Sequence, residues 1–244
     1  MSNFKLLNQV EHQDLKVITD KSESLGDKVM LALTFPFEFK RIQECYPIFF
    51  RKDANTGKFL PIALFGFQES ENLFLDHAGW QASYRPMMVE RGPFIIGFQQ
   101  VKTDEGVDKQ RVVTIDMDSP KVNKEQGEAL FLEDGSHTPY LDKVTELLEY
   151  VHEGSGQNDA FVAALSDNDL LEPLTLDITL NDGIRNQMQG FYTINEDKLA
   201  LLSADQLGAL HKHSFLQAIY MVIASQSNLT AMVNKKNALL ANQA

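Results

Sequence analysis

The amino-acid sequence predicts an α+β fold, with an antiparallel, β-rich N-terminal half and with helices gathered in the C-terminal half. Two observations support this prediction. Between residues 29 and 118, apolar and aromatic runs of strand length alternate with short polar turns. From residue 123 onward, the apolar residues recur mainly at helical spacing. A chain of 244 residues can bury a core of its own, so we expect a single domain over 1–244, with a weak hinge at 153–159.

The first predicted strands form hairpins. "YPIFFRK" and "KFLPIALFGF" flank the loop "DANTG", whose Gly57 can take the positive φ that such a loop needs. "NLFL" is expected to be the next strand, and a turn from Asp76 to Gly79 follows it. "SYRPMMVERGP" then predicts a short helix. "FIIGFQQV" and "QRVVTIDMD" predict a second hairpin across "KTDEGVDK".

Helical signals begin after these hairpins. Thr138 has the position of an N-cap and Pro139 that of the first helical residue, and the helical spacing continues as far as Gly154, where we expect the helix to end. "NDAFVAALSDNDLL" predicts another helix. "LTLDITL" and "MQGFYTI" then predict a hairpin around the turn "NDG".

The C-terminus is predicted to be helical. Ser203 and Ser214 each precede a Gln by three residues, which is the spacing of a capping box. From Phe215 to about Ala241 there is no Pro or Gly, and this predicts one long C-terminal helix. A surplus apolar stripe on that helix would support a homodimer.

Charge and composition disfavour several classes of protein. The net charge is −12 and the isoelectric point is about 4.9, so the field of the protein repels phosphate backbones and nucleic-acid binding is not expected. The apolar runs are too short to span a bilayer, which needs about 20 residues. No secretion signal is visible, and Cys45 is the only cysteine. We therefore predict a cytoplasmic protein without a membrane span, while a signal-less export route stays open.

Catalytic and cofactor motifs are not found in the sequence. It has no glycine-rich phosphate loop and no G-x-S-x-G elbow, and Cys45 at the edge of an apolar strand is expected to be a buried, inert thiol. The pair His12 and Asp14 lies too close to the N-terminus for a barrel-borne iron site, and His211 and His213 would point to opposite sides of a helix. We expect no metal and no cofactor, and no catalytic residue can be assigned.

One segment has the composition of a binding surface. "DHAGWQASYRP" and the arginine that follows bring together six side chains that suit recognition of a protein, a peptide or a small ligand: Asp76, His77, Trp80, Tyr84, Arg85 and Arg91. Trp, Tyr and Arg often anchor partners because they combine a large contact area with a polar end. The alternative is structural, with Trp80 and Tyr84 covering the core while Asp76 and Gly79 make a turn.

Several stretches together resemble the bacterial SapC family. The resemblance rests on "FPFEFKRIQECYPIFF", "FLPIALFGFQESENLFLD", "GWQASYRPMMVERGPF" and "LFLEDG", and on the later "FVAALSDNDLLEPL" and "MQGFYTINEDKLALL". It covers nearly the whole chain. It implies an accessory protein, named for association with a surface layer and found near nutrient-uptake systems and halogenase-like enzymes. It implies no catalytic residues.

Three functions follow as hypotheses. The first is a non-enzymatic binding or accessory protein that uses the segment from Asp76 to Arg91. The second is a metal-dependent, oxygenase-like enzyme working beside a halogenase or an uptake system, which would need distant His, Asp and Glu residues to converge. The third is a surface-layer or assembly protein that associates through its C-terminal helix. The absence of catalytic motifs places the first ahead.

Overall fold

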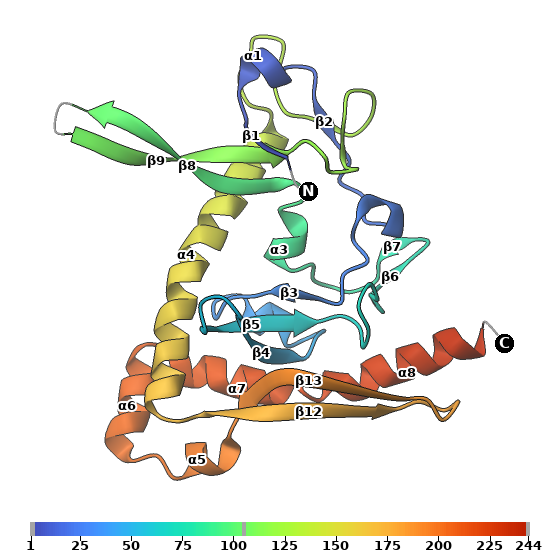
Figure 1. Cartoon of the computed structure of the whole chain (residues 1–244), viewed down its shortest axis with the longest axis vertical. Coiled ribbons are helices and arrows are strands. Elements are labelled where there is room, and N and C mark those ends of the chain that lie inside the picture. Colours follow the sequence, from blue (N-terminus) through green and yellow to red (C-terminus); the bar gives the residue numbers. More distant parts are fainter. Residues whose placement is uncertain (1–2, 104–105, 243–244) are drawn as a thin grey trace. The chain divides into compact units, whose positions relative to one another are not determined.

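The computed structural model describes residues 3–103 and 106–242, and its contacts divide the chain into two compact units. Unit 1 consists of residues 1–27 and 87–153, and unit 2 consists of residues 28–86 and 154–244. Figure 1 shows antiparallel hairpins and short strands together with helices, which confirms the predicted α+β class. That the chain acts as one domain with a hinge at 153–159 stays a prediction.

The main sheet of unit 1 is a long hairpin with one added strand. β8 (Phe94–Thr103) pairs with β9 (Gly106–Asp116) along its whole length, so the predicted hairpin is confirmed. Its turn falls on residues 104–105, outside the described residues. β1 (Phe4–Leu6) pairs with the end of β9 and completes the sheet order β1-β9-β8.

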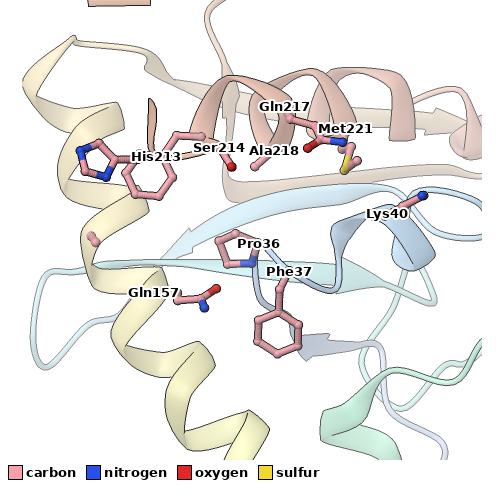
Figure 2. A pocket seen from close by; sticks show the side chains of 11 residues that line it. Pro36, Phe37, Lys40, Gln157, His213, Ser214, Gln217, Ala218 and Met221 are labelled. Atoms are coloured by element: carbon pink, nitrogen blue, oxygen red, sulfur yellow. The ribbon is translucent and has the colours of Figure 1, made fainter. Parts of the chain in front are cut away.

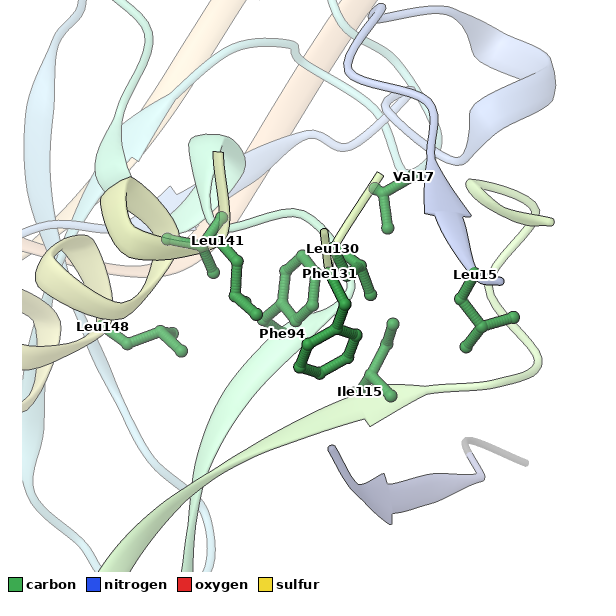
Figure 3. Packing of buried hydrophobic residues seen from close by; sticks show 9 residues of the cluster. Leu15, Val17, Phe94, Ile115, Leu130, Phe131, Leu141 and Leu148 are labelled. Atoms are coloured by element: carbon green, nitrogen blue, oxygen red, sulfur yellow. The ribbon is translucent and has the colours of Figure 1, made fainter. Parts of the chain in front are cut away.

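The rest of unit 1 is built from short elements around one apolar cluster. β2 (Lys16–Val17) lies between β10 (Val122–Asn123) and β11 (Glu128–Ala129). The short helices are α1 (Gln9–His12), a 3-10 turn (Glu23–Leu25) and α3 (Met87–Glu90). The cluster in Figure 3 joins β2 and the loop before α4 to the sheet and to the long helix that follows. Its buried members are Leu15, Val17, Phe94, Ile115, Leu130, Phe131, Leu141, Val144 and Leu148.

Unit 2 contains a five-stranded antiparallel sheet, and most of its members come from predicted hairpins. Its order is β12 (Leu171–Thr179), β13 (Arg185–Ile194), β4 (Ile48–Lys52), β5 (Phe59–Leu64) and β3 (Leu31–Leu33). Both predicted hairpins are confirmed, and Gly57 and Gly183 in their turns have the positive φ that favours glycine. β13 joins β4 at Phe191 and Tyr192, a pairing between residues far apart in the sequence.

Unit 2 also contains the helices α2 (Phe39–Ile42), α5 (Glu196–Ala200), α6 (Ala204–Lys212), α7 (Phe215–Ser225) and α8 (Asn228–Ala241). The capping box at Ser203 is confirmed, with both of its hydrogen bonds to Gln206 present. The long C-terminal helical segment is also confirmed, although a turn at Gln226 and Ser227 divides it into α7 and α8 (Figure 1).

The predicted helix end at Gly154 is wrong. α4 runs without interruption from Pro139 to Asp167, and the predicted second helix is its C-terminal part. Gly154 instead marks a close contact, because a Cβ atom at this position would lie 2.6 Å from the ring of Phe35 and 2.8 Å from that of Phe37. A glycine inside a helix can therefore signal close packing as well as a stop. The start of α4 is as predicted, with the amide of Leu141 donating to the hydroxyl of Thr138.

Candidate functional site

A pocket of about 510 Å³ lies within unit 2. Three segments of the chain form it: the turn that leads into α2, the C-terminal part of α4, and the junction of α6 with α7. Figure 2 shows Pro36 and Phe37 on one side of the pocket, with Ser214, Gln217 and Ala218 across from them. Lys40, Gln157, Ala160, His213, Phe215 and Met221 complete the lining. Its volume is that of ordinary small-molecule sites.

An aromatic side chain is fixed in the wall of this pocket. Phe37 is 39% exposed, and its ring stacks almost parallel on that of buried Phe35, with centroids 5.7 Å apart. Both rings lie against Gly154 of α4, where no side chain would fit. Gly154 therefore allows the stacked rings of Phe35 and Phe37 to approach α4 closely. The exposed part of the Phe37 ring can then contact a ligand.

The junction of α6 and α7 forms the opposite wall, and here the predicted capping box at Ser214 is wrong. Ser214 has a left-handed backbone with φ of 60°, and its side chain makes no capping hydrogen bond within the described residues. Its amide donates to the carbonyl of His211, as expected for a residue that ends α6 in a left-handed turn. Because only His213 and Ser214 separate the helices, Ser214 is committed to ending α6 and does not take the extended conformation of an N-cap.

Several groups that can attract an anion line this pocket. The N-terminus of α7 carries the partial positive charge of the helix dipole, and Ser214, Phe215 and Gln217 from that first turn line the pocket. Lys40 and His213 are exposed and also line it, and the His213 ring stacks on that of Phe215 at 5.6 Å. Gln157 and Gln217 add amide groups. The pocket therefore combines apolar walls with groups that suit an anion.

Five of the six predicted binding residues lie in unit 2, outside the lining of this pocket. Asp76 and His77 are exposed in the turn between β6 (Leu75–Asp76) and β7 (Gly79–Trp80), and the amide of Ala78 donates to the carboxylate of Asp76 at 2.7 Å. The predicted turn is confirmed. Trp80 is half-buried, with its ring centroid 5.2 Å from that of Phe65.

A hydrogen-bonded chain connects the aromatic residues of this segment to the core. Trp80 Nε1 donates to the hydroxyl of buried Tyr46 at 2.8 Å, and that hydroxyl donates to the carbonyl of Tyr84. The Tyr84 hydroxyl donates to Glu38 Oε1 at 2.8 Å, and the Arg41 guanidinium lies over the Tyr84 ring. Burial raises the pKa of Tyr46 above its usual range, so this phenol is a neutral donor. Trp80 and Tyr84 thus already contact residues of their own chain.

The remaining two predicted residues belong to different units. Arg85 is exposed in unit 2, whereas Arg91 belongs to unit 1, where its guanidinium donates to the carbonyl of Phe94 at 2.7 Å. Burial lowers the pKa of Arg91. The structure therefore does not bring all six residues together within one unit. Their role in binding stays a prediction.

The candidate metal ligands are used in other ways. Buried His12 is hydrogen-bonded to the backbone of Asn8, and exposed Asp14 accepts from Lys124 at 2.7 Å. That hydrogen bond holds the pKa of Asp14 below its usual value. Over residues 3–103 and 106–242, no three His, Cys, Asp or Glu side chains lie together as metal ligands would. Cys45 is half-buried rather than buried, with Sγ 3.1 Å from the hydroxyl of Ser83.

Membrane insertion can be assessed from the helices. In the part of the chain that the structure describes, none of them has both the length and the apolar character needed to cross a bilayer.

Sequence reasoning missed the residues that line the pocket. Ser214 resembled an N-cap, and nothing in a serine signals a left-handed backbone. Phe37 lies among three alternating phenylalanines, and the spacing does not indicate which ring stays exposed. The one usable signal was Gly154, since a glycine inside an otherwise helical pattern can mark a close approach of another segment.

Comparison with known proteins gave one result. The model of a family described as SapC matches residues 7–232. No curated protein and no solved structure matched the chain.

Proposed function

This chain belongs to the SapC family, and from that membership and the pocket of unit 2 we propose an accessory binding function. The ligand is a small organic molecule with an apolar, flat body and an acidic group. The single observation that supports this proposal is the pocket of about 510 Å³ that pairs aromatic walls with Lys40 and the N-terminus of α7.

Apolar contact and charge both favour such a ligand. Phe37 and Phe215 offer apolar surface, and about 25 cal/mol is gained for each Å² of apolar ligand surface removed from water. An acidic group in this pocket gains from the Lys40 ammonium and from the dipole of α7, since both line the pocket. Since Lys40 is exposed, its charge supplies selectivity more than affinity.

Two fluorescent probes with the same kind of aromatic body test the proposal. Anilinonaphthalene sulfonate carries an anionic group, and N-phenylnaphthylamine lacks it. We expect the intact protein to bind the sulfonate more tightly. Lys40→Gln should weaken the sulfonate about two- to fivefold, as expected for an exposed ion pair, and leave the neutral probe unchanged. Ala160→Phe fills the pocket from the exposed face of α4 and should weaken both probes.

The matched control is Lys109→Gln on β9, which makes the same change of charge at an exposed residue outside the pocket. It should leave both affinities unchanged. Equal binding of the two probes, or sulfonate binding that survives Ala160→Phe, would overturn the proposal. Circular dichroism of each variant confirms that the fold is intact.

The other functions predicted from the sequence have less support. Within the described residues no three potential metal ligands lie together, so no observed site favours the metal-dependent enzyme. The homodimer through the C-terminal helical segment stays a prediction, and light scattering over a range of protein concentrations would test it.

A further inference from the structure

The two histidines of the sequence "HKH" have different surroundings in unit 2, although both are exposed. His211 belongs to α6, and its backbone carbonyl accepts from the amide of Ser214. His213 lies between α6 and α7 and lines the pocket, whereas His211 is not part of the lining. One histidine of the pair can therefore act on a ligand in the pocket, and the other provides a natural comparison.

Aromatic stacking orients the imidazole of His213. Its ring centroid lies 5.6 Å from that of Phe215, and the two ring planes differ by 27°. Figure 2 shows His213 beside Ser214, on the opposite side of the pocket from Lys40. The ammonium and the imidazole therefore approach a ligand from different directions.

The lining of the pocket contains no carboxylate among the residues that the structure describes. Lys40 and His213 are the side chains of that lining that can carry a charge between about pH 5 and pH 8. Gln157 from α4 and Gln217 from α7 are polar but do not titrate. A proton on His213 would therefore add a second positive charge to a lining that already holds one.

Charged groups of the neighbouring elements lie outside the lining and have other partners. On α4, Asp159 accepts from Lys58 at 2.9 Å. At the start of α2, buried Glu38 accepts from the hydroxyl of Tyr84 at 2.8 Å. Lys212, exposed at the end of α6, has positive charge, and the first turn of α7 has no acidic residue. The described lining thus holds no negative charge that would cancel a proton on the imidazole.

We propose that protonation of His213 strengthens the binding of acids in the unit 2 pocket, so that the site holds its ligand more tightly at mildly acidic than at mildly alkaline pH. This pH dependence rests on the proposed function, since it concerns the same pocket. Histidine side chains ordinarily gain a proton near pH 6.5, and the added cation attracts the acidic group of the ligand as the pH falls. By linkage, a bound acid in turn favours the protonated imidazole.

The two fluorescent probes of the proposed function also test its pH dependence, because neither probe titrates between about pH 5.5 and pH 8. At constant ionic strength, we expect anilinonaphthalene sulfonate to bind about two- to fivefold more tightly at the lower pH, as for one exposed charge. N-phenylnaphthylamine should bind equally at both pH values. Circular dichroism at each pH confirms that the fold is intact.

Two substitutions remove the proton site in different ways. His213→Gln removes the ring, and His213→Phe keeps a ring that can stack on Phe215 but cannot titrate. Both should abolish most of the pH dependence of sulfonate binding, whatever they do to the affinity itself. His211→Gln is the matched control, since it removes an exposed histidine outside the lining, and it should keep the pH dependence.

Lys40→Gln separates the two charges of the lining. It should weaken sulfonate binding at both pH values and leave the pH dependence in place. The inference would be overturned by sulfonate binding that does not change with pH, by pH dependence that persists in both His213 variants, or by its loss in His211→Gln. Sulfonate that binds equally at both pH values, but more tightly than the neutral probe, would leave the proposed function standing. Equal binding of the two probes at both pH values would overturn the function and its pH dependence together.

Discussion

Two glycines in one helix test how close packing shapes unit 2. Gly154 and Gly156 both lie inside α4, so replacing either by Ala gains about 1 kcal/mol of helix propensity. Around Gly156 there is no atom within 4 Å of a new Cβ, whereas at Gly154 the Phe35 ring would be 2.6 Å away. Overpacking of this kind costs about 1–3 kcal/mol. We therefore expect Gly156→Ala to raise the free energy of unfolding and Gly154→Ala to leave it unchanged or lower it by up to about 2 kcal/mol.

The assay is urea unfolding followed by the fluorescence of Trp80, which lies in the same unit as both glycines. The difference between the two variants should be about 1–3 kcal/mol, with unchanged dependence on urea. Because Phe37 lines the pocket and also lies against Gly154, only Gly154→Ala should weaken binding of anilinonaphthalene sulfonate. Equal stabilisation by both substitutions would refute the reasoning, since it would mean that the Phe35 stack yields to a methyl group at no cost.

Three further predictions concern hydrogen bonds and cooperativity. Tyr46→Phe removes a hydroxyl that accepts from Trp80 and donates to the carbonyl of Tyr84. We expect it to lower the free energy of unfolding by about 1–3 kcal/mol, measured by circular dichroism in urea. A loss below about 0.5 kcal/mol would contradict this role of the hydroxyl. In the same assay, Ser203→Ala should lower the free energy of unfolding by about 1 kcal/mol, because the helix cap is lost. Ser214→Gly should raise it by about 1 kcal/mol, because glycine adopts a left-handed backbone without strain. A destabilising effect of Ser214→Gly would argue against that strain. If the chain is one domain, Tyr140→Trp on a Trp80→Phe background should unfold with a single midpoint, whether followed by fluorescence of the new tryptophan in unit 1 or by circular dichroism of the whole chain. Separate midpoints in that one variant would indicate two domains.

The proposed pocket would bind an acid on a chain whose net charge is −12. Lys40 and the N-terminus of α7 line the pocket, so its local groups, rather than the net charge of the chain, would select the ligand.

Local rules in the sequence determined much of the secondary structure. Gly57 and Gly183 terminate strands in turns that need a positive φ, and Thr138 and Ser203 begin helices because their hydroxyls accept from amides in the first turn. Strand-length runs on either side of polar turns also identified both long hairpins. These signals are reliable because the interactions join residues close in the sequence.

The candidate sites depended on interactions between distant residues, and only the tertiary structure decided them. Trp80 and Tyr84 had the residue types of a binding surface, but Tyr46 and Glu38 hold them through hydrogen bonds that no local pattern reveals. The pocket joins segments near residues 37, 157 and 214. The sequence by itself determined the α+β class and most helix and strand types, since those follow from periodicity and caps. The exposure of each aromatic ring and the position of each charged side chain depend on packing, and packing is determined by the whole fold.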